Sequence, residues 1–410
     1  MPCFIYVVVS LAGITAPAFC NDVCATETAA STPQELPKTE EVASHKFSGQ
    51  LLSQVFNSTY GGIERKTVFL SMLKLEFSGK LPGKYTYYID NLTTRGGSPS
   101  AHTGDIQTIS YIDAPHKNTF MEAWLEKETD HLGSSLRFGM FDLNAEFDCT
   151  VVGWLFINSS FGVGHELSQT GRNGPSIFPT SSLGLRYKKQ FEHDLYLQTA
   201  ILDGVPGDLE HISGTYIRLS KEEGALLIAE GGMHKGGKDD TDVPLFKASI
   251  GAWKYTSKFD HLSETDAAGN PVKLDTNQGM YFICAKRFWE SKREPKRKCS
   301  GFLRYGFANQ NINRTERFVS SGVYYKNLLN KNERIGLGIV KAYNGSVWKE
   351  LMRNTSTPAD DAEAAVEATL EFPIDARLTI QGDCQWIQHP GAQEKLMDAM
   401  AFGLNVVYTF

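Results

Sequence analysis

The sequence has little that would suit nucleic acid, a structural metal or a membrane-spanning helix. Its 410 residues carry a formal net charge of −6, so no basic field is available to bind a polynucleotide. The seven cysteines are scattered without a CxxC pair or other ligand spacing, and we expect no metal and no cofactor. Beyond the N-terminus, no segment reaches the roughly 18 apolar residues of a membrane helix. The chain could therefore cross a membrane only with strands.

The N-terminus carries an export signal followed by a polar arm. Phe4 to Ala18 is an apolar run that ends in Ala-Pro-Ala, so residues 1–20 are predicted to be a cleaved signal peptide. Residues 21–59 are mostly polar and predict a flexible arm, in which Ser48 to Phe56 could form a short helix. Residues 60–410 are predicted to form a single folded unit built of strands.

From Val68 onward the sequence repeats a strand of about ten residues followed by a turn. Successive strand side chains point to opposite faces, and in many of these strands apolar residues alternate with polar ones. This alternation behind a signal peptide predicts an all-β fold, a transmembrane antiparallel β-barrel of about 16 strands with an aqueous channel. The last strand should carry the signal for the barrel-assembly machinery, with one face formed by Phe402, Leu404, Val406, Tyr408 and Phe410.

The most distinctive stretch runs from Ser135 to Pro179. It begins as a predicted strand whose acids and amide share one face, Asp142, Asn144, Glu146 and Asp148, opposite Phe141, Leu143, Ala145 and Phe147. A bulge near Met140 would account for a break in the alternation upstream. A long insert rich in Gly, Ser, Asn and Pro follows, with Arg172 near its centre. An insert of that length is usually either functional or disordered.

Several segments resemble the carbohydrate-selective porin family of Gram-negative outer membranes. They are GDIQTISYIDA (Gly104–Ala114), FMEAWLEKE (Phe120–Glu128), SLRFGMFDLNAEFD (Ser135–Asp148), Leu155–Tyr187, LYLQTAILDGVPGD (Leu195–Asp208), Glu367–Gly391 and the terminal strand. The resemblance covers most of the chain from about Tyr60. It implies a sixteen-stranded channel, a monomer in the outer membrane, for passive uptake of small sugars such as glucose.

A channel for neutral sugars needs donors, acceptors and aromatic faces that bind weakly enough for release. We expect loops that fold inward, so that the insert narrows the lumen and Arg172 donates to sugar hydroxyls. The candidate sugar-binding residues are Asp142, Asn144, Glu146, Asn158, Glu166, Gln169, Arg172 and Asn173. Alternatively, Arg172 pairs with a wall acid and only holds the insert in place. Trp154 and Phe156 could contact sugar, or could belong to an aromatic girdle or to the core of the loop.

Other functions stay open at this point. A general, non-selective porin would share the fold, and a secreted β-rich carbohydrate-binding protein would share the alternation without depending on Phe410. No Ser/His or Asp/His set can be assembled, so we do not expect an enzyme. The basic run Lys292–Lys298 departs from the family pattern and predicts an exposed turn, with contact to anionic lipid head groups as an alternative. Cys284 and Cys299 flank this turn and could pair.

Overall fold

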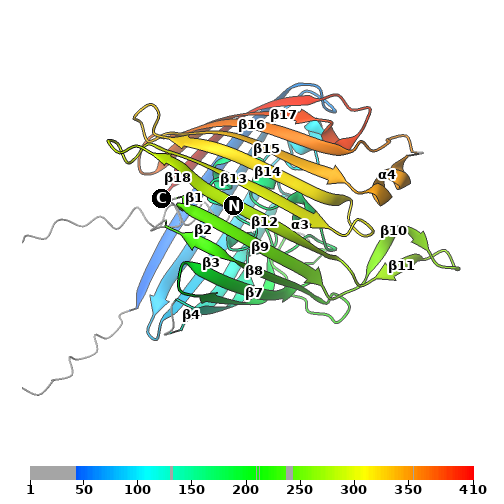
Figure 1. Cartoon of the computed structure of the whole chain (residues 1–410), viewed down its shortest axis with the longest axis horizontal. Helices are drawn as coiled ribbons and strands as arrows, with labels where there is room; N and C mark the ends of the chain where they lie inside the picture. The colour runs from blue at the N-terminus through cyan, green and yellow to red at the C-terminus, as the bar shows by residue number, and fades with distance from the viewer. Residues whose placement is uncertain (1–42, 130–132, 209, 212, 237–242, 354) are drawn as a thin grey trace, which may run out of the picture.

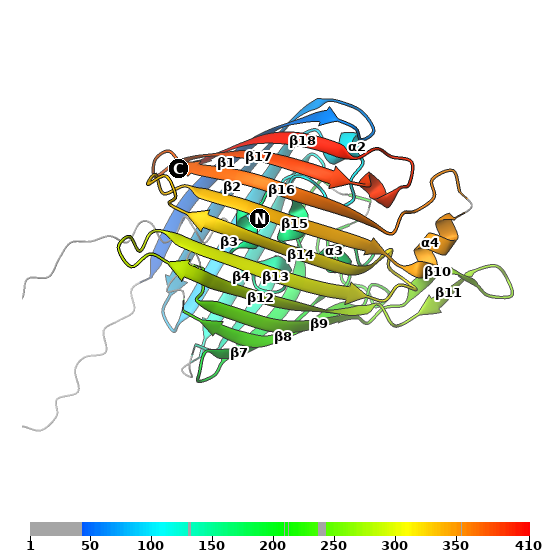
Figure 2. The same cartoon turned by 45° about the horizontal axis from the view of Figure 1, so that its top comes forward.

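The computed structural model describes residues 43–129, 133–208, 210–211, 213–236, 243–353 and 355–410, which form a closed antiparallel barrel of sixteen strands (Figures 1 and 2). Strands that are neighbours in the barrel follow one another along the chain, and the ring closes where β1 (Ser44–Tyr60) pairs with β18 (Ala399–Thr409). A separate two-stranded sheet, β10 and β11, is inserted between β9 and β12. The predicted barrel is therefore confirmed, whereas the predicted signal peptide lies outside the described residues.

The remaining elements have the following bounds. The other barrel strands are β2 (Thr67–Leu81), β3 (Tyr85–Gly96), β4 (Lys117–Glu128), β5 (Ser135–Phe141), β6 (Ser182–Gln190), β7 (Leu195–Asp203), β8 (Ala225–Lys235), β9 (Phe246–Tyr255), β12 (Gln278–Glu290), β13 (Lys298–Ala308), β14 (Thr315–Lys326), β15 (Arg334–Asn344), β16 (Ala362–Pro373) and β17 (Leu378–Gln388). The inserted hairpin is β10 (Phe259–Thr265) and β11 (Pro271–Leu274), and the short α-helices are α2 (Ser100–Thr103), α3 (His165–Ser168) and α4 (Ser346–Met352).

The two ends of the barrel differ in their connections. At the short-turn end, tight turns join β2 to β3, β6 to β7 and β16 to β17, and the C-terminus lies at this end, to the left in Figure 1. At the long-loop end, longer connections follow β3, β5, β7, β9 and β15, and they include α4 and the β10–β11 hairpin, to the right in Figure 1. Short turns at one end and long loops at the other are typical of outer-membrane barrels.

The wall is apolar outside and largely polar inside. Along β18, Phe402, Leu404 and Tyr408 are exposed, whereas Asn405 is buried in the interior, as the alternation predicts. Exposed large apolar residues recur on nearly every barrel strand, so the outer surface suits lipid. Phe410 extends the closing seam, because its N–H donates to the Gly49 carbonyl at 2.9 Å and its carbonyl accepts from Gly49 at 2.8 Å. Among the described residues, no helix has the length and hydropathy of a transmembrane span.

Residues 21–42 of the predicted arm lie outside the described residues, and the prediction of an arm over residues 43–59 with a helix over Ser48–Phe56 is wrong. These residues lie in β1, which pairs with β18 on one side and β2 on the other. Leu51 and Val55 face outward, while Leu52 and Phe56 face inward against residues from inside the barrel. Apolar residues on both faces of this strand produced spacings of one and four residues, which imitate a helical pattern.

The predicted strand over Phe141–Asp148 is also wrong. Strand β5 ends at Phe141, its pairing with β4 shows no register shift near Met140, and a 3₁₀ turn at Leu143–Ala145 follows. The reason is local, because the Asp142 carboxylate accepts the Asn144 N–H at 2.7 Å and so caps that turn. Cys284 and Cys299 are free and lie opposite Leu303 and Trp289, on different rungs of the β12–β13 ladder, so the suggested pair does not form.

Candidate functional site in the barrel lumen

Two connections from the long-loop end fold into the barrel. We call residues 97–116, between β3 and β4, the first lumen segment, and residues 142–181, between β5 and β6, the second lumen segment. Their backbones are joined, since the Ser159 N–H donates to the Thr108 carbonyl and the Tyr111 N–H donates to the Ile157 carbonyl, both at 2.9 Å. The lumen is therefore filled by two segments that support each other, whereas the sequence predicted only the second.

A buried ion pair attaches the second lumen segment to the wall. The Arg304 guanidinium on β13 lies 3.0 Å from the Asp148 carboxylate, and both side chains are fully buried. Arg304 also donates to the carbonyls of Asp148 at 2.7 Å, Gly162 at 2.9 Å, and Ser160 and Phe161 at 3.3 Å. Burial raises the pKa of Asp148 to about 6 although Arg304 opposes this shift. One wall arginine thus holds several turns of the segment.

A second electrostatic attachment uses Glu146. Its carboxylate lies 2.5 Å from the Arg186 guanidinium on β6 and 3.5 Å from that of Arg137 on β5. Burial alone would raise the pKa of Glu146, but the charges of Arg137 and Arg186 outweigh burial and lower the pKa to about 2. Glu146 is therefore ionised and anchors the second lumen segment to the barrel wall. The sequence had suggested instead a carboxylate that lines the wall and contacts sugar.

Wall carboxylates on β16 bind the backbones of both lumen segments. Glu363 accepts the N–H groups of Ile106 and Gln107 at 2.9 and 3.0 Å. Glu367 accepts those of Ile157 and Asn158 at 2.6 and 2.9 Å. Because buried N–H groups need partners, these carboxylates take the place that a neighbouring strand would otherwise fill.

Inward-facing glycines make room for aromatic rings of the second lumen segment. A Cβ placed on Gly322 of β14 would lie 2.8 Å from the Phe156 ring, and one on Gly338 of β15 would lie 2.7 Å from the Phe161 ring. These two phenyl rings stack with centroids 4.2 Å apart. Phe156 therefore packs in the core of the loop, which was one of the three roles left open by the sequence.

The lumen segments line several cavities, and two of them share Trp154 in their lining. The larger, of about 440 Å³, is lined by residues of both segments and by Asp208 and His211 from a loop at the long-loop end. The smaller, of about 180 Å³, is lined by residues near the short-turn end, including Lys188, Gln190 and His234. Among the described residues, Trp154 alone lines both cavities. Trp154 thus borders both the cavity toward the long-loop end and the cavity toward the short-turn end.

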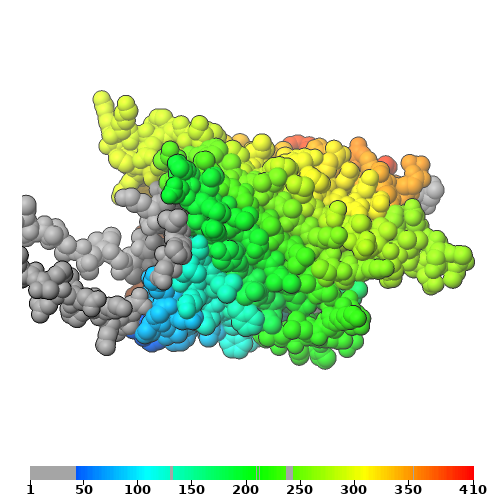
Figure 3. Space-filling model, turned by 60° about the horizontal axis from the view of Figure 1, so that its bottom comes forward, coloured from blue at the N-terminus to red at the C-terminus, as the bar shows by residue number. Residues whose placement is uncertain are grey.

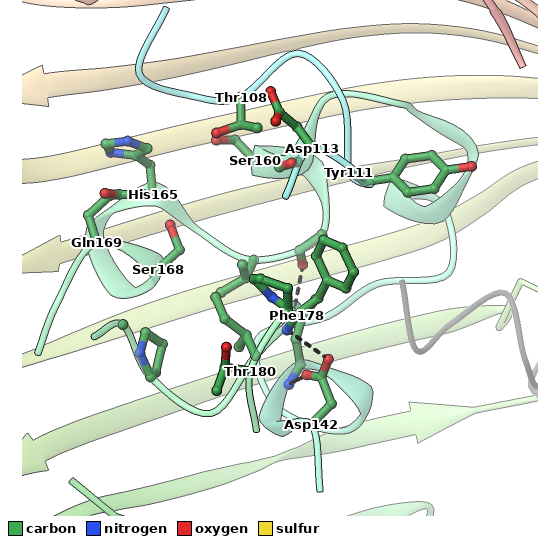
Figure 4. Close-up of a pocket in the computed structure, with 18 of the residues that line it drawn as sticks. Thr108, Tyr111, Asp113, Asp142, Ser160, His165, Ser168, Gln169, Phe178 and Thr180 are labelled. Atoms are coloured by element: carbon green, nitrogen blue, oxygen red, sulfur yellow. Dashed lines mark hydrogen bonds between the residues drawn. The ribbon is translucent and has the colours of Figure 1, made fainter. Parts of the chain in front are cut away.

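Figure 4 shows the larger cavity, with Ser168 and Gln169 of the second lumen segment on one side and Thr108 and Asp113 of the first on another. Phe178 and Thr180 approach from below in this view. His165 is tied to Thr315 at 2.8 Å and to the Ile106 carbonyl at 3.0 Å. Burial lowers the pKa of His165 to about 4, so its ring is neutral near pH 7.

Five of the eight predicted sugar-binding residues line the larger cavity: Asp142, Asn144, Asn158, Gln169 and Asn173. Most of them are already bonded within the protein. The Asn144 amide donates to three backbone carbonyls of its own segment, and that of Asn173 donates to the Pro206 carbonyl at 2.6 Å. The Asn158 amide donates to Gln385 at 3.1 Å. Gln169 is exposed and forms no side-chain hydrogen bond to any described residue.

The other three predicted residues lie elsewhere. Glu146 lines the smaller cavity, as an anchor. Glu166 is buried against Gly306 of β13 without a hydrogen-bond partner in the described chain, and burial raises its pKa well above the usual range. Arg172 is exposed, lines neither cavity and forms no ion pair with any described residue. The alternative in which Arg172 pairs with a wall acid therefore has no support in this structure.

Sequence reasoning missed the cavity residues of the first lumen segment, among them Thr108, Tyr111 and Asp113. The available signal was the run Gly-Gly-Ser-Pro at residues 96–99, where a strand ends and a connection without alternation begins. No group of three or more His, Cys, Asp or Glu residues that could hold a metal occurs in the described part of the chain.

Known proteins share this fold and sequence pattern. A family model described as "Carbohydrate-selective porin, OprB family" matches residues 84–410. Porin B of Pseudomonas aeruginosa is 23% identical over 347 residues, which cover 77% of this chain and 73% of that protein. The high-pH structure of Pseudomonas putida OprB superposes with a TM-score of 0.76 at 16% identity, covering 89% of this chain and 94% of that chain. The outer membrane channel DcaP of Acinetobacter baumannii has a TM-score of 0.54 at 12% identity, with 91% and 99% covered.

The structural likenesses show the fold, and the family model spans most of the sequence. The resemblance of the sequence segments to the carbohydrate-selective porin family is therefore confirmed. The chain belongs to the OprB family of carbohydrate-selective porins, channel proteins of the Gram-negative outer membrane.

Proposed function

We propose that neutral monosaccharides such as glucose cross this channel by passive diffusion, with weak binding in the larger cavity and a narrowing at Trp154. The observation that carries the proposal is that Trp154 lines the cavities at both ends of the passage. An aromatic face can contact the C–H surface of a sugar ring. At about 440 Å³ the larger cavity falls in the size range of small-molecule pockets, about 300–1,000 Å³.

The lining of the larger cavity suits a neutral, hydroxyl-rich solute. The exposed amide of Gln169 and the hydroxyls of Ser168 and Thr108 offer donors and acceptors, and Phe178 adds a ring. Asp113 and Asp208 lie on this lining with Lys117 as a cationic counterpart, so the field does not favour anionic sugars. A few neutral hydrogen bonds give weak binding, which release requires. No covalent or catalytic step is part of this mechanism.

The proposal extends to the oligomeric state, to the lipid that surrounds the barrel and to the machinery that assembles it. The protein functions as a monomer surrounded by outer-membrane lipid, to which the exposed apolar side chains around the barrel offer a suitable surface. The C-terminal strand with Phe402, Leu404, Val406, Tyr408 and Phe410 serves as the signal for the barrel-assembly machinery.

Single-channel conductance in a planar bilayer, titrated with glucose, tests this function. We expect conductance steps that glucose reduces at saturating concentration, together with a larger conductance and weaker glucose block in Trp154→Ala. The matched control is Trp386→Ala, because Trp386 lies on the outer face of β17 and is exposed there. Steps that glucose leaves unchanged would favour a general, non-selective porin, and the absence of steps from folded protein would contradict both channel functions.

A further inference from the structure

The turn between β12 and β13 carries unneutralised positive charge. Its cations Lys292, Arg293 and Lys296 are exposed and form no ion pair or hydrogen bond with any described residue. The one acid within the turn, Glu294, is taken by Arg297 at 2.6 Å. Arg297 also donates to Asn330 at 2.8 Å, which joins this turn to the next one, between β14 and β15. We call Lys292, Arg293 and Lys296 the rim cations.

A β-bulge below this turn directs two aromatic residues outward. The pairing of β12 with β13 shifts register between Arg287 and Trp289. Because of the extra residue, Phe288 and Trp289 both reach the outer surface, where they are 60% and 46% exposed. Trp289 stacks on Tyr325 of β14 with centroids 5.8 Å apart. Aromatic residues gather at the membrane–water boundary, so these rings mark the edge of the hydrocarbon layer.

The rim cations lie just beyond that boundary. Strands rise about 3.3 Å per residue and tilt by about 40° in such barrels, so the step from Trp289 to the start of the turn at Ser291 gains about 5 Å along the membrane normal. This distance corresponds to the level of the lipid head groups. On the adjoining turn, Leu328 and Leu329 are 48% and 53% exposed and add apolar surface beside the rim cations. Figure 3 shows these turns projecting at the upper left of the molecule.

We propose that this rim is a binding site for acidic phospholipids of the inner leaflet, with the rim cations holding the phosphate-bearing head group. The short-turn end of an outer-membrane barrel faces the periplasm, where the leaflet is made of phospholipid. Three cations without counter-charges, next to exposed aromatic and leucine side chains, match a ligand that is anionic at one end and apolar at the other. The proposal rests on the outer-membrane location and is independent of sugar selectivity.

Lipid titration followed by native mass spectrometry tests the site with the full-length protein in dodecyl maltoside micelles. The probes are phosphatidylglycerol and phosphatidylcholine with the same acyl chains. The variant is Lys292→Gln/Arg293→Gln/Lys296→Gln. The control is Lys221→Gln/Lys254→Gln/Lys258→Gln, which removes three exposed cations at the long-loop end. Each cation near an anionic lipid surface contributes roughly fivefold in affinity, so the preference for phosphatidylglycerol should fall by at least about tenfold in the rim variant alone.

A second measurement does not depend on any variant. Raising NaCl from about 0.05 to about 0.5 M should weaken phosphatidylglycerol binding to the natural sequence and leave phosphatidylcholine binding unchanged. An unchanged preference in the rim variant, or an equal loss in the control, would overturn the proposal. Competition by inorganic phosphate at the same concentration as the lipid would also overturn it, because the turn would then hold a small anion and not a lipid.

Discussion

Replacing Arg304 by methionine should release the second lumen segment from the wall without breaking the barrel. Arg304 lies on β13 with its side chain fully buried, and its guanidinium faces Asp148 and four backbone carbonyls of that segment. Methionine preserves much of the length and apolar contact of the side chain. It removes the charge and every one of these hydrogen bonds.

The expected cost is large for a single residue. Removing one partner from a buried ion pair costs about 3–5 kcal/mol, because the other charge is left buried and unpaired. A value of about 4 kcal/mol would increase the undocked fraction of the segment roughly a thousandfold. The barrel ladder itself uses backbone hydrogen bonds of β13 that the substitution leaves in place. The defect should therefore appear in the channel before it appears in folding.

Single-channel recording gives the most direct assay. Arg304→Met should show a larger or fluctuating conductance and a loss of glucose block, while the exposed Arg65→Met control should resemble the natural protein. The pKa of Asp148, raised to about 6 by burial, should rise further once Arg304 is gone. Protonation of Asp148 then removes the unpaired charge, so the defect should diminish as pH falls from 7 to 5.

The double variant separates the lost charge from the lost hydrogen bonds. Asp148→Asn/Arg304→Met contains no unpaired buried charge, so it should be closer to the natural channel than Arg304→Met. Natural conductance and glucose block in Arg304→Met would refute the reasoning. So would a double variant that is worse than the single one, since the ion pair would then not be what holds the segment.

Three further results are expected. Gln169→Ala should weaken glucose block about fivefold, the value of one neutral hydrogen bond. Arg172→Ala should change glucose block little, because Arg172 lines neither cavity. A loss of glucose block in Arg172→Ala would restore the sugar-binding role that the sequence predicts for Arg172. Asp142 and Asp148, whose pKa values burial raises from 3.8 to about 6, bind more protons when docked than when exposed. His165, whose pKa burial lowers to about 4, opposes this effect, but it is one group against Asp142, Asp148 and Glu166, whose pKa values are all raised. Hydrogen-exchange protection of residues 142–181, corrected for intrinsic rates, should therefore increase from pH 7 to pH 5, over a range in which Glu146, with its pKa lowered to about 2, stays ionised. Decreasing protection would contradict this sign. Deleting Phe410 should lower the heat-modifiable folded fraction in the outer membrane, because both of its backbone groups bond to Gly49 at the seam, whereas the outward-facing Phe69→Ala should not; equal yields would argue against an assembly role.

The barrel could be predicted from the sequence because lipid and water, on opposite faces of each strand, impose a local pattern on the side chains. Lipid outside and polar groups inside require side chains to alternate with period two, and Phe402, Asn405 and Tyr408 follow this rule in sequence and in structure. The rule fails in β1, where a lumen segment covers the inner face. There, Leu52 and Phe56 are as apolar as the outward Leu51 and Val55, and the alternation disappears.

The alternation of apolar and polar residues also led to a wrong prediction where the chain leaves the barrel wall. The residues from Asp142 to Asp148 alternate like a strand, yet their polar groups are spaced for a cap and two anchors. Asp142 caps a turn, Glu146 meets Arg186, and Asp148 meets Arg304, which is 156 residues away in the chain. The capping pattern of Asp-x-Asn could have been recognised locally. The arginine partners could not, because only the closed barrel brings them to this segment.

The same limit explains why the predicted sugar-binding residues fare so differently. A sequence shows which residues can hydrogen-bond, but not which of them the fold has already used. Asn144 and Asn158 lie on the cavity with their amides bonded inside the protein, whereas Gln169 lies there with its amide unbonded among the described residues. A solute that must leave again needs groups of the second kind, because breaking a structural bond to bind it would cost more than the new bond returns. We therefore expect the specificity of this channel to depend on the few polar groups that remain after the lumen segments have been held in place.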